Sequence, residues 1–214
     1  MTVTEQTLAE RAGLYSLLHA LYTYPLTESL LADVARLSLP AESPLFDGLV
    51  QMQTSQRGTE ALNVEMTRLL EGPGRTPAPP YASYYLNDKL LMGPPATMAR
   101  QTYLEWQIAP EGDQYTPDDH LALELGFMAY LAQLALASEP DRNKALVASY
   151  RFLVDQIVPW LPHFSRALAQ ATEEPFFVGL VRFTQAAVQS DLEWLESYLR
   201  ADPRQTPSVQ TPGV

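Results

Sequence analysis

Apolar residues recur at intervals of three and four positions along most of the chain, which is the spacing of one helical face. The first such stretch covers residues 8–21 and stops before Pro25. The same pattern predicts further helices over residues 27–38, where Thr27 is suited to cap the first turn, and over 43–54 and 59–71. Four helices therefore open the chain.

A loop rich in glycine and proline, "EGPGRTPAPPYASYYL" at residues 71–86, interrupts this series. Gly72 and Gly74 are expected to end the preceding helix, because glycine tolerates the positive φ found at helix ends and the prolines forbid continuation. We therefore expect residues 71–85 to be ordered but irregular, with Tyr81 packed near the start of the helix predicted from Pro117.

The segment 117–138 is the most apolar of the predicted helices. Thr116 is positioned as its N-cap and Pro117 as its first residue. Because its leucines, Phe127 and Met128 cover nearly the whole circumference, this helix belongs in the middle of a bundle. We expect the N-terminal and C-terminal helices to bury its sides.

The remaining helices are predicted at residues 94–107, 141–157, 160–171 and from Pro175 through Tyr198. No stretch alternates like a strand, and no period of 20 to 50 residues repeats. The pattern predicts an all-α fold, a single-domain helical bundle of roughly nine to eleven helices over residues 1–201. Residues 202–214 contain three prolines and little to bury, so a disordered tail is expected there.

Charge and composition limit the classes of binding partner and site that this chain can have. The chain has 14 Lys and Arg against 25 Asp and Glu, a formal net charge of -11, which argues against a nucleic acid and suits a cationic partner. It has no cysteine, so disulfides and thiolate metal sites are excluded. No secretory signal is visible, and the longest apolar stretch is too short for a membrane span, so a soluble, cytoplasmic protein is expected.

Catalytic motifs are missing from the sequence. There is no phosphate-binding glycine pattern, no nucleophile elbow and no His-Glu-x-x-His, so neither an enzyme nor a bound cofactor is expected. His120 and Glu124 stand four positions apart and could reach one metal ion, but two ligands without a third do not make a site. No metal is therefore expected.

Two local features have both a structural and a functional interpretation. Asp119 could cap backbone amides beside a buried His120, or both side chains could accept hydrogen bonds from a cationic ligand in a groove. Tyr81, Tyr84 and Tyr85 follow Pro80 and could form a rigid surface for a peptide, or they could plug the bundle. The residues themselves leave both alternatives open.

Taken together, these segments resemble the TorD/DmsD/NarJ-like family of molybdoenzyme maturation chaperones. "VEMTRLLEGPGRTPAPPYASYYL" is similar to the family's first hallmark, and "DHLALELGFM" at residues 119–128 to its Asp-His-x-x-x-Glu-Leu-x-Phe-Met hallmark. A weaker third pattern comprises Trp160, Pro162, Phe164 and the aromatic pair at 176–177. The sequence departs from the family at Met66, Leu70, Ala82 and Gly126, and the missing carboxylate at Ala82 puts in doubt any contact made there in relatives.

The resemblance implies a cytoplasmic chaperone that binds the twin-arginine leader, the body, or both, of the catalytic subunit of a molybdopterin-dependent oxidoreductase. It implies a peptide-binding region with the stiff loop and the Asp-His segment as its walls, formed by Pro80, Tyr81, Tyr85, Asp119, His120 and Glu124. Two alternatives stay open: a GTP-binding or GTP-hydrolysing protein, and a structural subunit retained in the mature reductase. The client, and the choice between a monomer and a helix-exchanged dimer, are not determined by the sequence.

Overall fold

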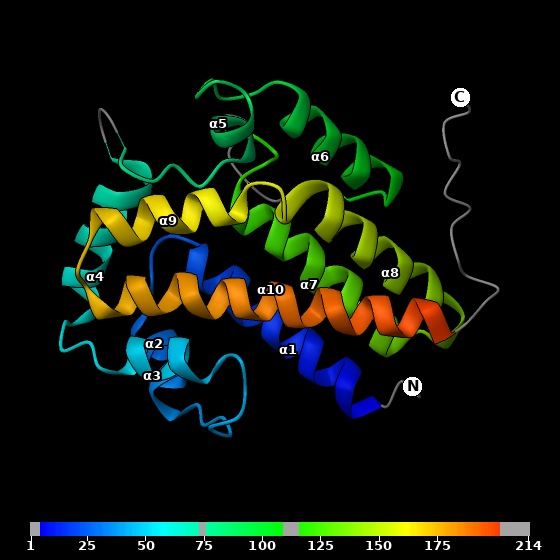
Figure 1. The fold of residues 1–214 in the computed structure, drawn as a ribbon, viewed down its shortest axis with the longest axis horizontal. Coiled ribbons are helices and arrows are strands. Elements are labelled where there is room, and N and C mark those ends of the chain that lie inside the picture. The colour runs from blue at the N-terminus through cyan, green and yellow to red at the C-terminus, as the bar shows by residue number, and fades with distance from the viewer. Residues whose placement is uncertain (1–4, 73–75, 109–115, 202–214) are drawn as a thin grey trace.

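The computed structural model describes residues 5–72, 76–108 and 116–201. Within these ranges it contains ten α-helices, two π-helical turns and no strand, which confirms an all-α single-domain bundle (Figure 1). The expected disordered tail at 202–214 lies outside the described residues. The elements are α1 Glu5–Tyr22, α2 Glu28–Arg36, α3 Phe46–Gln53, α4 Thr59–Met66, η1 Thr67–Glu71, α5 Ala82–Leu86, α6 Pro94–Glu105, α7 Leu121–Ala137, α8 Glu139–Phe152, η2 Leu153–Ile157, α9 Leu161–Ala171 and α10 Pro175–Ala201.

Helix α7 is central, as its apolar circumference predicts. Ten of its seventeen residues are buried, and it packs mainly against α1 and α8. Of the terminal helices expected to bury its sides, α1 does so, whereas the last helix, α10, packs chiefly against α3 and α9. Periodicity identifies which faces are apolar but carries no information on which helix meets which.

The start of α7 also differs from the sequence prediction. The helix begins at Leu121, and its N-cap is His120 rather than Thr116. The residues between them form a turn, in which the backbone N–H of His120 donates to the carbonyl of Pro117 at 3.2 Å. This turn leaves Asp119 and His120 free to contact the segment around Tyr81.

The loop prediction is partly wrong. Residues 82–86 form the short helix α5 instead of irregular chain. Gly72 follows η1 with a φ of -57°, so positive φ is not the reason for a glycine there, and Gly74 lies outside the described residues. A Cβ at Gly72 would lie 3.1 Å from the carbonyl oxygen of Thr67, which makes close packing the better explanation.

Helices α3 and α10 approach each other at two glycines. A Cβ at Gly48 would lie 2.5 Å from the backbone nitrogen of Phe183, and one at Gly179 would lie 2.5 Å from that of Met52. Such distances are far inside van der Waals contact, so only residues without a side chain permit this packing. The glycines thus allow α10 to lie directly on α3.

A buried ion pair joins α1 to α10. Arg11 Nε donates to Asp191 Oδ1 at 2.5 Å, and the hydroxyl of Tyr15 donates to Asp191 Oδ2 at 2.7 Å. The Arg11 guanidinium also lies over the Trp194 ring, 5.1 Å from its centroid. A buried pair of this kind is costly to break from one side, so it fixes how the two terminal helices meet.

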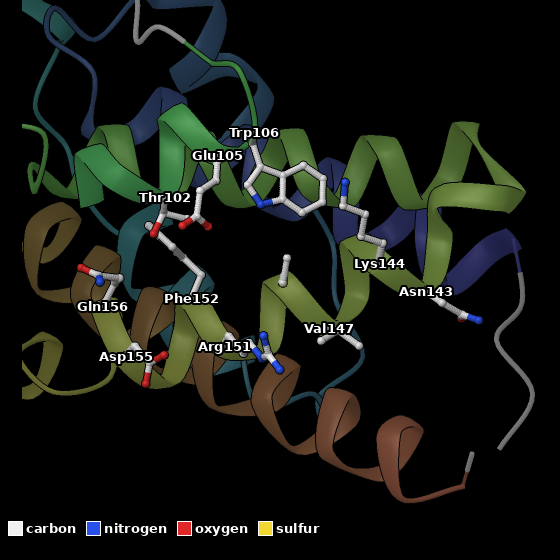
Figure 2. A pocket seen from close by; sticks show the side chains of 11 residues that line it. Thr102, Glu105, Trp106, Asn143, Lys144, Val147, Arg151, Phe152, Asp155 and Gln156 are labelled. Atoms are coloured by element: carbon white, nitrogen blue, oxygen red, sulfur yellow. The ribbon is translucent and has the colours of Figure 1, made fainter. Parts of the chain in front are cut away.

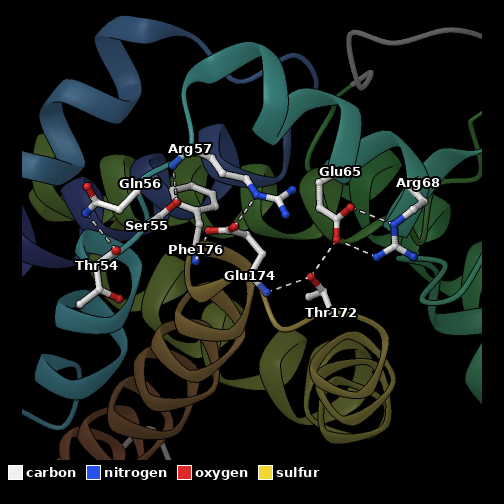
Figure 3. Close-up of polar contacts among 9 residues, drawn as sticks. All are labelled: Thr54, Ser55, Gln56, Arg57, Glu65, Arg68, Thr172, Glu174 and Phe176. Carbon is white, nitrogen blue, oxygen red and sulfur yellow. Dashed lines mark hydrogen bonds and ion pairs between the residues drawn. The ribbon is translucent and has the colours of Figure 1, made fainter.

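A second polar network joins α4 to the connection between α9 and α10 (Figure 3). Glu65 accepts hydrogen bonds from Arg68 Nε at 2.8 Å and from the Thr172 hydroxyl at 2.7 Å. Arg57 pairs with the nearly buried Glu174, 2.8 Å from Nε to Oε2. These bonds lower the pKa of Glu65 to about 2, chiefly through the hydrogen bond from Arg68, and they anchor the start of α10.

No helix in the described part of the chain combines the length and the apolar character that a bilayer crossing requires.

Candidate peptide-binding site

The proline-rich segment and the start of α7 are joined through their backbones. The N–H of Ala82 donates to the carbonyl of Asp119 at 3.1 Å, and the N–H of Leu121 donates to that of Pro80 at 2.8 Å. These two bonds form an isolated antiparallel bridge between Tyr81 and His120. The prediction that Tyr81 packs near the start of this helix is therefore confirmed.

The side chains of the bridge also touch. The Tyr81 and His120 rings meet edge to face, with their centroids 4.9 Å apart. Pro80 is buried, and Tyr81 is half-buried with one side open to solvent. Burial raises the pKa of the Tyr81 phenol, and the nearby carboxylates of Glu71 and Asp119 raise it further, so Tyr81 stays a neutral hydroxyl at physiological pH.

Asp119 is fully buried and caps α5. Its Oδ2 accepts a hydrogen bond from the backbone N–H of Ser83 at 2.6 Å. Its Oδ1 is also buried, and no described residue donates to it. Asp119 is thus a helix cap, as the structural interpretation expects. The helix that it caps is α5, not α7, which follows it in sequence. One oxygen of the carboxylate is left for a donor.

His120 caps α7 with its imidazole. Nδ1 accepts a hydrogen bond from the N–H of Ala122 at 3.1 Å. Burial lowers the pKa of His120 to about 4, and the neighbouring His19 contributes in the same direction. His19 Nδ1 in turn lies 2.8 Å from the carbonyl oxygen of Ala122. Near neutral pH, His120 is therefore an uncharged acceptor.

Glu124 lies one turn into α7 and is fully buried. In the described part of the chain neither of its carboxyl oxygens has a hydrogen-bond partner, although the indole N–H of Trp160 lies near enough to favour its ionised form. Burial, and after it the charge of Asp119, raises the pKa of Glu124 well above its usual range. Two carboxyl groups thus lie together in the interior, and three of their oxygens have no hydrogen-bond partner among the described residues.

Tyr85 covers this interior from α5. Its ring stacks on Trp160, with centroids 5.7 Å apart, and meets Phe164 edge to face at 6.3 Å. Its hydroxyl is buried and receives no hydrogen bond from the described residues. A cavity of about 680 Å³ opens beside it between α5 and α9, lined by Thr76, Pro77, Tyr84, Tyr85, Leu86, Asp88, Lys89, His163 and Ala167.

An apolar surface next to this cavity was not anticipated from the sequence. Large apolar side chains are exposed at the end of α5, in the segment after it and on α6: Leu86, Leu90, Leu91, Met92 and Met98. The segment between the two helices has positive φ at Asp88, Lys89 and Met92, and its consecutive apolar residues lie at the surface. The run "KLLMGPP" at residues 89–95 is the sequence feature that could have indicated this surface. Its three consecutive apolar residues stand before Gly-Pro-Pro and do not fit the three-and-four spacing of a buried helical face.

All six residues expected at the site thus lie within one region, where α5 meets the start of α7 and α9. Four of them, Pro80, Asp119, His120 and Glu124, are buried, while Tyr81 and Tyr85 form its partly exposed cover. Ser83 and Trp160 belong to the same region and were not predicted as site residues. Within the described ranges, no three His, Asp or Glu side chains are placed to hold a metal ion.

The chain is similar to proteins of known role. It is 25% identical over 203 residues to the chaperone protein TorD of Aliivibrio salmonicida (strain LFI1238), covering 87% of this chain and 94% of the relative. It is 29% identical over 206 residues to the TorD of Vibrio cholerae serotype O1 (strain ATCC 39315), covering 87% and 92%. Both relatives carry the name of a chaperone, which is a non-enzymatic role.

One solved structure, from Archaeoglobus fulgidus and described as a redox enzyme maturation protein, is 22% identical with a TM-score of 0.49, covering 87% of this chain and 93% of that one. The model of the family described as nitrate reductase delta subunit matches residues 31–166. Because that match spans more than half of the chain, the protein belongs to this family, the TorD/NarJ-like maturation chaperones whose hallmark segments its sequence carries.

Proposed function

We propose that this chain is a cytoplasmic maturation chaperone that binds the leader of a molybdopterin-dependent oxidoreductase and so holds its catalytic subunit until the cofactor is inserted and export proceeds. The observation that carries the proposal is the group of buried carboxyl oxygens at the start of α7 that have no hydrogen-bond partner among the described residues: Oδ1 of Asp119 and both oxygens of Glu124. Family membership supplies the class of client.

Buried acceptors without donors are costly, and a guanidinium is the side chain best suited to them. It presents five N–H donors in a planar fork and keeps its charge in every environment a protein offers. An arginine entering here would pair with Asp119. Its positive charge would also favour the loss of the proton from Glu124. The Tyr81 ring lies beside the path and offers its face to the cation.

Access to the two carboxyl groups requires a movement of the cover. Asp119 and Glu124 are both fully buried, and the segment from Pro80 to Tyr85 lies over them. That segment is held by the backbone bridge at Tyr81 and by the cap on Ser83, both of which an incoming strand could replace. In our proposal the leader displaces this segment and takes over its hydrogen bonds.

The chain also offers a separate surface on which the apolar part of a leader could bind. Exported leaders carry an apolar stretch of about 7–15 residues next to their basic residues. The cavity beside Tyr85 and the exposed side chains from Leu86 to Met98 extend from the arginine site and offer apolar, partly methionine-lined area. The net charge of -11 also favours encounter with a basic leader over an acidic one.

Calorimetry with a synthetic leader tests the proposal. The probe is a leader with two consecutive arginines, and its control has lysines in their place. We expect the arginine peptide to bind at least tenfold tighter, and Asp119→Asn to weaken it by about ten- to a hundredfold, as the loss of one partly desolvated charged contact predicts. Asp33→Asn removes the same charge from the exposed face of α2 and should leave the affinity unchanged.

The companion variants are Tyr81→Ala, His120→Ala and Glu124→Gln, each with its thermal midpoint. Unchanged affinity in all three variants, with lowered midpoints for Tyr81→Ala and His120→Ala, would show that these residues serve the fold alone and that a leader binds elsewhere. Co-purification of the chain with a molybdopterin reductase subunit from the native host would identify the client.

A further inference from the structure

A second groove lies away from the leader site, between the C-terminal half of α6 and the side of α8 and η2 (Figure 2). Its volume is about 620 Å³, and it shares no lining residue with the cavity beside Tyr85. The lining positions on α8 and η2 repeat in steps of one and three from Asn143 to Gln156. They form one continuous side of a helix, about 20 Å long.

The floor of the groove is apolar. Val147 and Ala148 are half-buried in its middle, Phe152 is buried beside them, and Trp106 forms the opposite wall. At one end the side chain of Gln156 also lines it, although Gln156 is only 5% exposed. The Gln156 amide makes no hydrogen bond within the described parts of the chain. The groove is thus lined at this end by a nearly buried glutamine whose amide has no hydrogen-bond partner among the described residues.

Two cations lie on either side of the apolar floor. Lys144 and Arg151 are seven positions apart, so they lie two helical turns from each other on the same side of α8. Neither forms an ion pair with a described residue, and Lys144 Nζ lies over the Trp106 ring, 4.7 Å from its centroid. In a chain with 25 acidic and 14 basic residues, two unpaired cations in one groove indicate an anionic partner.

The charges at the other end differ. Asp155 lines the groove next to Gln156, one turn beyond Arg151, so the charge along α8 and η2 changes sign, and Glu105 adds a second acid from α6. A small symmetric anion has no use for an apolar floor and an acidic far end. A helix lying along the groove suits its cations, its apolar floor and its glutamine amide together. The side chains of such a helix can place acidic groups at the cations, an apolar group on the floor and a hydrogen-bonding group at the amide.

We propose that this groove binds an amphipathic helix of a partner protein that carries two acidic side chains two turns apart, with an apolar residue between them. The acids pair with Lys144 and Arg151, and the apolar residue packs on Ala148 and Trp106. This goes beyond leader binding, since a leader with consecutive arginines has the opposite charge. It gives the chaperone a separate contact for a folded or folding segment of another chain.

The test uses a labelled 20-residue helical peptide in an alanine and glutamine background, with Glu at two positions seven apart and Leu midway. The control peptide has Lys in place of both Glu. Fluorescence anisotropy with the full chain should show at least tenfold tighter binding of the Glu peptide. The double variant Lys144→Glu, Arg151→Glu should reverse this preference, whereas Arg166→Glu, an exposed cation on α9, should not change it.

An uncharged variant tests the contribution of the groove's shape to binding separately from the contribution of its charges. Ala148→Phe fills the floor without altering any charge and should weaken the Glu peptide at least tenfold, while the circular-dichroism midpoint reports that the fold is kept. The proposal is overturned if the Glu peptide does not bind, if charge reversal leaves its affinity unchanged, or if inorganic triphosphate displaces it at equal concentration. Leader affinity measured on the same variants should not change, so a failure here is distinct from a failure of leader binding.

Discussion

The carboxylate of Asp119 accepts a hydrogen bond from the backbone N–H of Ser83 at 2.6 Å, so a residue in the turn before α7 caps a helix that precedes it by 36 positions. Helix α5 has no side-chain cap of its own. The segment over the proposed leader site is therefore held by the same residue that is proposed to receive the leader's arginine. If the leader binds there, its binding and the order of this segment are coupled through one side chain.

Asp119→Ala should lower the free energy of unfolding by about 1–3 kcal/mol, because it removes a buried charged acceptor and the cap of α5. Asp119→Asn keeps an acceptor oxygen and should lose less. Chemical denaturation measures both, and hydrogen exchange at the Ser83 amide should accelerate in the alanine variant. Asp118→Ala is the control, since Asp118 pairs with the exposed Arg100 and should cost under about 1 kcal/mol. Equal losses at 118 and 119 would contradict the capping role.

Gly179→Ala should destabilise the protein by about 1–3 kcal/mol although alanine favours helices. Its Cβ would lie 2.5 Å from the backbone nitrogen of Met52 and 2.6 Å from the carbonyl oxygen of Gly48, so α3 and α10 must separate. Gly13→Ala in α1 is the matched control: apart from its chain neighbours and the backbone of its own helix, no described atom lies within 4 Å of the added Cβ, and the variant should be more stable by about 0.5–1 kcal/mol. Thermal unfolding that ranks the two variants the other way would exclude direct backbone packing at Gly179.

Glu124→Gln should stabilise the protein at neutral pH, by about 1–3 kcal/mol, while weakening leader binding. The pKa of Glu124 is raised in the folded state, so its contribution to stability is complete below the unfolded value near 4.5 and is lost as the pH rises toward the folded value. Glutamine has no proton to lose. Unfolding curves of the two proteins should therefore converge near pH 4 and separate by pH 7. Curves that stay parallel would show that Glu124 does not hold a proton when folded.

Glu65→Gln should have the opposite pH dependence. The pKa of Glu65 is lowered from 4.5 to about 2 in the folded state, so the stability that it contributes is present above pH 4.5 and is lost as the pH falls toward 2. At pH 7 the variant should be less stable by roughly 1 kcal/mol, a value kept small by the exposure of Arg68. Glu60→Gln, which removes an exposed carboxylate of the same helix, is the matched control. A difference at pH 7 that persists at pH 2 would argue against the Arg68 contact.

Much of the fold can be predicted from local pattern. The boundaries of α2, α9 and α10 follow from caps and prolines at or beside the helix ends, and Thr27 caps α2 as expected, with its hydroxyl oxygen 3.2 Å from the backbone nitrogen of Leu30. The central place of α7 follows from its composition, because a helix that is apolar on all sides has no stable position at a surface. The site region could be predicted as well, since Asp119, His120 and Tyr81 lie in recognisable motifs.

What only the tertiary structure decided depends on contacts between segments far apart in the chain. Five residues from Ala82 to Leu86 are too few for a stable isolated helix, and α5 exists because Asp119 and its carbonyl bind the first two amides. The same contacts hold residues 117–120 out of α7. Burial of both carboxyl groups, and the groove that Trp106 forms with α8, likewise arise where separate helices meet. Periodicity records which face of a helix is apolar, but the partner of that face, and the cost of a charge placed there, are properties of the folded whole.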